Sequence, residues 1–126
     1  MQGLFRIRKP FILFVMCLAL GCSSSTSNQT PEALNGRLEA ALALTDTGKR
    51  DGALVKVAED AASAGQAEVV KKALSRVTDI GKRDDAAENC ALKLAKAGKG
   101  AEAADVAKTI TDSGKRDSTL SKLAKG

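Results

Sequence analysis

The stretch TDTGKRD (45–51) returns twice along the chain, as TDIGKRD (78–84) and as TDSGKRD (111–117). Six of the seven positions are identical in all three copies, and the copies are spaced by 33 residues. Positions outside the motif keep the same spacing, in the columns Leu44/Val77/Ile110, Val57/Cys90/Leu123 and Ala58/Ala91/Ala124. A period in this range predicts stacked repeats, in which each unit buries its apolar face only against its neighbours.

Each repeat contains two apolar patterns of helical period. In the second repeat, one helical face collects Ala67, Val70, Ala73, Leu74 and Val77, and a later face collects Ala87, Cys90, Ala91, Leu94 and Ala95. No run alternates with the period of two that is typical of a strand. The pattern therefore predicts an all-α fold of antiparallel helix pairs, in about three 33-residue repeats, with helices at 32–46, 50–64, 66–80, 83–97, 100–113 and 116–125.

The recurring motif is expected to form the turn between two helices. Gly81 stands where a helix ends in a left-handed residue, and Asp84 stands where the next helix would be capped. The equivalent glycines are Gly48 and Gly114, and the equivalent acids are Asp51 and Asp117. We also expect Asp79 to pair with Arg83 across this turn.

The composition argues against an enzyme. The 126 residues include no His, so the usual general base near neutral pH and the commonest metal ligand are both missing. The carboxylates do not cluster, and Cys90 lies in an apolar column, where it serves as a small buried hydrophobe. We therefore expect no catalytic residue, no metal and no cofactor.

The first 21 residues are interpreted as an export signal. Arg6, Arg8 and Lys9 precede an apolar run at 11–20 that is shorter than a membrane-spanning helix. The following LALGC resembles the lipobox of bacterial lipoproteins, although Ala19 and Leu20 stand in the reverse of the usual order. The resemblance implies a lipoprotein signal peptide at 1–21 and a lipid, such as palmitate, on Cys22. An ordinary signal peptide or an uncleaved anchor is the alternative.

Residues 22–30 then read as the lipidated Cys and a flexible tether, because SSSTSNQT contains nothing apolar. The protein is thus expected in the bacterial cell envelope, anchored by lipid in a membrane. Ser23 favours the outer membrane if the source is Gram-negative. Loss of the signal leaves 17 basic residues against 15 acidic ones, and no aromatic platform for bases exists, so nucleic acid is not an expected partner.

The segment 91–117 resembles tetratricopeptide-type helical repeats, through Ala95, Gly98, Glu102, Ala103 and Ala107. The chain departs from that family because aromatic residues are missing and Lys115 replaces a closing Pro. HEAT-like pairs are the competing architecture, but their units are longer. The resemblance implies that residues 31–126 form a short right-handed α-solenoid.

Such families bind proteins or peptides in a groove, so the resemblance implies a protein-protein interaction scaffold for an envelope protein or peptide. The candidate partner-binding residues are Lys56, Glu59, Asn89, Lys93 and Lys122. A further hypothesis is a basic edge that binds an acidic partner. The alternative is a solvated turn whose basic charges are balanced by neighbouring acidic residues. The residues of this edge are Lys49, Arg50, Lys82, Arg83, Lys115 and Arg116. The alternative function is a structural envelope lipoprotein that self-associates into a homo-oligomer without a dedicated ligand.

Overall fold

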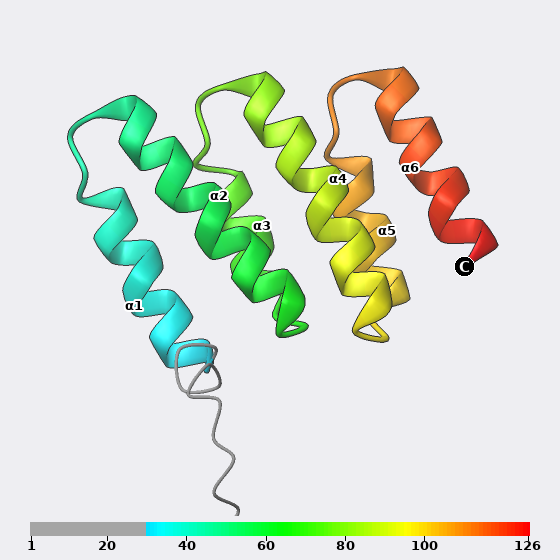
Figure 1. Ribbon diagram of the computed structural model, residues 1–126, viewed down its shortest axis with the longest axis horizontal. Helices are drawn as coiled ribbons and strands as arrows, with labels where there is room; N and C mark the ends of the chain where they lie inside the picture. The colour runs from blue at the N-terminus through cyan, green and yellow to red at the C-terminus, as the bar shows by residue number, and fades with distance from the viewer. Residues whose placement is uncertain (1–29) are drawn as a thin grey trace, which may run out of the picture.

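The computed structural model describes residues 30–126, and six helices account for most of this stretch (Figure 1). They are α1 (Pro31–Leu42), α2 (Thr47–Ser63), α3 (Ala67–Leu74), α4 (Ile80–Lys96), α5 (Gly100–Lys108) and α6 (Ser113–Lys125). No strand occurs between residues 30 and 126, so the predicted all-α class is confirmed. The interpretations of the signal peptide, of Cys22 and of the tether fall on residues outside this range, except for Thr30.

The longer helices α2, α4 and α6 begin inside the TDxGKRD motif. Their N-caps are Asp46, Asp79 and Asp112, each with extended backbone. Each side chain accepts a hydrogen bond from the backbone N–H three residues on, at 2.8, 2.9 and 2.6 Å. A carboxylate at this place satisfies an N–H that the helix leaves unpaired, and it faces the positive end of the helix dipole. The prediction that the second Asp of each motif caps the helix is therefore wrong.

Gly81 likewise does not end a helix. It lies in the first turn of α4, where a Cβ would come 3.3 Å from Oδ1 of the capping Asp79. The helix before it, α3, ends at Leu74, several residues earlier than predicted. Among the described residues, only Gly65 and Gly98 have left-handed backbone, at φ of 71° and 79°. The prediction that Gly98 ends a helix is confirmed.

The core is built from small aliphatic side chains, as the composition suggests. Its largest fully buried members include Leu34, Leu54, Val70, Leu94, Val106 and Ile110. Alanines on facing helices are also fully buried, which lets the helix backbones approach closely. The core therefore follows the whole row of helices in one continuous cluster.

The helices follow one another along the long axis of the molecule (Figure 1). Helix α2 contacts α1, α3 and α4, and helix α4 contacts α3, α5 and α6. The three turns that carry the motif lie along one edge, at the top of the view in Figure 1. In the part of the chain described, no helix combines the length and the apolar character needed to cross a membrane.

Candidate interaction face

The second Asp of each motif holds the following turn of the chain. The carboxylate of Asp51, on α2, accepts hydrogen bonds from the backbone N–H groups of Thr78 at 3.1 Å and Asp79 at 2.9 Å. Asp51 is only 2% exposed, and both of its oxygens are used. One side chain therefore fixes the start of α4 against α2.

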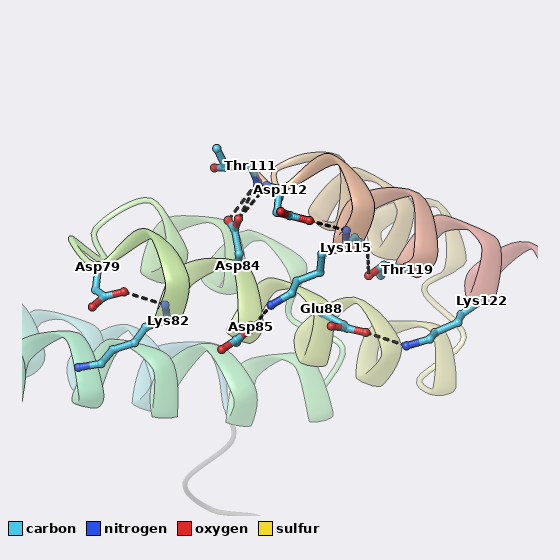
Figure 2. A network of polar contacts seen from close by, with 10 residues as sticks. All are labelled: Asp79, Lys82, Asp84, Asp85, Glu88, Thr111, Asp112, Lys115, Thr119 and Lys122. Carbon is cyan, nitrogen blue, oxygen red and sulfur yellow. Dashed lines mark hydrogen bonds and ion pairs between the residues drawn. The ribbon is translucent and has the colours of Figure 1, made fainter.

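The same joint recurs one repeat later. Asp84, 4% exposed, accepts from the N–H groups of Thr111 at 3.0 Å and Asp112 at 2.9 Å. Figure 2 shows the Asp84 side chain directed at this pair of nitrogens. We call these two arrangements, Asp51 with 78–79 and Asp84 with 111–112, the carboxylate joints.

Both joints favour the ionised carboxylate. The N–H groups of Asp79 and Thr78 lower the pKa of Asp51, with burial opposing them and Arg50 assisting. At Asp84, burial is the largest influence and raises the pKa, but the bonds from Thr111 and Asp112 together with the charge of Arg83 outweigh it, so the pKa is lowered.

The third Asp of the series, Asp117, has a different environment. Its side chain is 77% exposed, and its contact is a 3.8 Å approach to the Nε of its neighbour Arg116. Within residues 30–126, no turn lies beyond α6 to donate a pair of N–H groups to this carboxylate. Sequence reasoning gave the three acids one role, whereas the structure gives two of them a joint and leaves the third open to solvent.

The five candidate partner-binding residues all lie on α2, α4 and α6. Helix α2 contacts α4, and α4 contacts α6, so the three helices that carry these residues lie in one series. A groove of about 240 Å³ opens between α2 and α4, and its lining includes Glu59, Asn89, Val55 and Lys82. We call this side of the molecule, carrying Lys56, Glu59, Asn89, Lys93 and Lys122, the α2–α4–α6 face.

Ion pairs bridge the helices along this face. Lys93 Nζ lies 3.6 Å from Glu59 Oε2, and Lys122 Nζ lies 2.8 Å from Glu88 Oε1. Lys115 also pairs with Asp85, as Figure 2 shows. Glu88 and Asp85 were not identified from the sequence. The shared spacing of Glu59 to Lys93 and Glu88 to Lys122, which is 34 residues, is the signal that could have found the first of them.

The basic edge lies in the first turns of α2, α4 and α6. Its members are not equivalent: Lys115 pairs with Asp85, and Arg83 donates to Thr111 Oγ1 at 3.0 Å. The ion pairs of the described region do not include the expected Asp79–Arg83 contact, because the Asp79 carboxylate caps α4 instead. Two of the three Lys-Arg pairs are followed in sequence by a buried carboxylate, Asp51 or Asp84, and the charges of Arg50 and Arg83 help to lower the pKa of these carboxylates.

Cys90 is fully buried and has a free thiol. Burial, aided by the charge of Glu59, raises the pKa of this thiol to about 12. A thiol of this kind is a poor nucleophile and a poor metal ligand. Residues 30–126 also contain no group of three His, Cys, Asp or Glu side chains arranged to hold a metal ion.

Comparison with known proteins adds no family: no protein-family model, no curated protein and no solved structure matches this chain.

Proposed function

We propose that residues 31–126 form a short right-handed α-solenoid of tetratricopeptide-like helix pairs that acts as a protein-protein interaction scaffold in the bacterial cell envelope. In this proposal a lipid on Cys22 anchors the chain, and the tether holds the helices away from the membrane. The observation that carries the proposal is the alignment of three helices in one face by two identical carboxylate joints.

The α2–α4–α6 face is suited to a polar or mixed partner. The groove between α2 and α4 combines the half-buried Val55 with the polar side chains of Glu59 and Asn89. Asn89 is exposed and can both donate and accept hydrogen bonds. Such a face can bind an extended or helical segment with modest affinity and little rearrangement.

The proposal is tested with a photo-reactive amino acid at position 89, in cells that make the protein. A matched control carries the same group at Lys72, which is exposed on α3 and lies outside the α2–α4–α6 face. A discrete crosslinked product from position 89 alone supports the scaffold. Equal products from both positions, or none from position 89, would contradict it. The anchor is tested separately, because Cys22→Ser should release the protein from membranes.

Self-association is the second candidate, and a specific observation favours it. Leu44 is 38% exposed, whereas its counterparts in the repeat, Val77 and Ile110, are 3% and 1% exposed. At the other end of the row, Leu120 and Leu123 are half-buried, whereas Leu54, Ala87, Val57 and Cys90 in the same columns are buried. Apolar positions that are covered inside the row are thus open at both of its ends.

A further inference from the structure

We infer that two molecules of this protein join head to tail, the α6 end of one docking on the α1–α2 end of the other, with the Asp117 carboxylate accepting the backbone N–H groups of Thr45 and Asp46. The inference rests on the self-association named above and specifies its contacts. The surface it uses shares Lys56 with the α2–α4–α6 face.

The α1–α2 end, which we call the head, supplies two hydrogen-bond donors. Thr45 and Asp46 occupy the positions of Thr78 and Asp79 in the first copy of the motif. The backbone N–H groups of Thr45 and Asp46 have no hydrogen-bond acceptor within residues 30–126, although the equivalent groups of the second and third turns are held by carboxylates. The first turn is exposed, so these donors are accessible.

The α6 end, which we call the tail, supplies the hydrogen-bond acceptor. Asp117 occupies the position of Asp51 and Asp84, and its exposed carboxylate has no backbone N–H partner in the described chain, only the Arg116 side chain at 3.8 Å. Inside the molecule, an Asp at this position takes its two N–H groups from residues 27 and 28 positions further on. The same register, carried from one molecule to the next, assigns Thr45 and Asp46 to Asp117.

The apolar surfaces at the two ends also correspond. A groove of about 350 Å³ opens at the head between α1 and α2, lined by Arg37, Ala40, Ala41, Leu44, Ala53, Lys56 and Val57. One repeat on, most of these positions are apolar and buried: Val70, Ala73, Leu74, Val77, Ala86 and Cys90. Both α2 and α5 contact α3 and α4 there, and α2 precedes them in the row, as α6 of one molecule would precede α1 and α2 of the next. Helix α6 is also the third-repeat counterpart of α2. A second molecule's α6, bringing Leu120 and Leu123, is therefore the occupant that the head groove fits.

The repeat places one pair of opposite charges at this contact. The pairing of Glu59 with Lys93 defines which positions face each other on adjacent long helices. At the 33-residue spacing, the position equivalent to Glu59 in the third repeat is Lys125, and the position equivalent to Lys93 in the first repeat is Asp60. The head-to-tail contact thus places Lys125 of one molecule opposite Asp60 of the other, with the two signs exchanged relative to the internal pair. Asp60 already pairs with Arg37 and Lys56 of its own molecule, so Lys125 would join an existing cluster of charges and contribute little to the register.

A head-to-tail contact uses different surfaces on the two molecules. Such a contact leaves one free head and one free tail after every addition, so it builds chains or closed rings rather than a symmetric dimer. This property separates the proposed joint from a side-by-side dimer formed through any single patch.

The test uses the full-length protein in detergent and two variants that each disable one end. Asp117→Asn removes the charge of the acceptor at the tail, and Leu44→Glu places a charge in the head groove. Both side chains are exposed, so both variants should keep the helical circular dichroism of the wild type. The matched control is Asp105→Asn. Asp105 is an exposed carboxylate on α5, and its ion pair is with Lys108, three residues further along the same helix.

Sedimentation velocity across protein concentrations gives the readout. The wild type and Asp105→Asn should form species larger than dimers, and each end variant alone should associate at least about tenfold more weakly. A mixture of the two variants retains one intact tail and one intact head, and it should stop at a dimer. A monomeric wild type, or variants that assemble like the wild type, would overturn the joint. Assembly that is insensitive to both variants would leave self-association standing and refute only these contacts, and the crosslink at position 89 reports on partner binding separately.

Discussion

The carboxylate of Asp51 lies 2.9 Å from the backbone nitrogen of Asp79, so an acid of one motif holds the capping residue of the next. Asp79 in turn caps α4 through Lys82. The first acid of each TDxGKRD copy therefore caps its own helix. The second acid of the first two copies, Asp51 and Asp84, holds the helix that follows.

Removal of a carboxylate joint should lower the free energy of unfolding, because it leaves two backbone N–H groups without an acceptor. Asp84→Ala removes a buried carboxylate and leaves the N–H groups of Thr111 and Asp112 without their acceptor, and we expect the free energy of unfolding to fall by about 2–3 kcal/mol. Asp117→Ala changes the same motif position where it is exposed, so its cost should stay below about 0.5 kcal/mol. Urea unfolding of both variants, at a protein concentration that keeps the chain monomeric, measures the difference. Equal costs would show that the joints do not contribute.

Acid should lower the free energy of unfolding through Asp51 and Asp84, the two carboxylates of the joints. The pKa values of Asp51 and Asp84 are lower in the folded state than the ordinary value of about 3.9 in the unfolded state. The unfolded chain therefore binds these protons first, and the stabilisation is complete above about pH 4 and is lost as pH falls through the folded pKa. Urea midpoints measured from pH 6 down to pH 2 should fall at the acid end. The double variant Asp51→Asn/Asp84→Asn should have a flatter profile, and an unchanged slope would count against this origin.

Two glycines should respond to alanine in opposite directions. Gly98 has φ of 79°, and a side chain there should lower the free energy of unfolding by about 1–2 kcal/mol. Gly36 lies within α1, and a Cβ at this position meets nothing within 4 Å. Gly36→Ala should therefore raise the free energy of unfolding by up to about 1 kcal/mol, because alanine favours the helix. Thermal unfolding of the two variants would contradict the assigned backbone if both shifts had the same sign.

The Cys90 thiol should not react with alkylating reagents in the folded protein. Complete burial and a pKa of about 12 leave almost no accessible thiolate at neutral pH. We expect no alkylation of Cys90 by iodoacetamide at pH 8 in native buffer and full alkylation in denaturant, read by peptide mass spectrometry. Rapid modification of the native protein would show that α4 is less tightly packed than described.

Much of this fold could be predicted from the 33-residue period. The all-α class, the buried columns around Val77 and Ile110 and the stop at Gly98 all follow from spacing and from helical periodicity. The period also predicted that residues of one column have one environment, and this holds only inside the row. Leu44 and Asp117 are exposed, because the described chain has no helix before α1 and none after α6 to cover them.

The carboxylate joints could not be predicted in the same way. TDxGKRD contains two acids five residues apart, and local rules allow either of them to cap a helix. The choice depends on where the turn of the next repeat lies, which is a contact across 27 residues of sequence. Asp85 and Glu88 were overlooked for a related reason: an acid in the first turns of a helix is expected whether or not a lysine from another helix meets it.

Hydrogen exchange at the three turns tests most directly whether one repeat's carboxylate holds the next repeat's backbone. In the monomeric protein the amides of Thr78, Asp79, Thr111 and Asp112 should exchange slowly, whereas those of Thr45 and Asp46 should exchange at nearly the rate of an open chain. Asp84→Asn should speed exchange at Thr111 and Asp112 and leave Thr78 and Asp79 unchanged. Equal exchange at all three turns, or an Asp84→Asn effect spread evenly over them, would contradict the account.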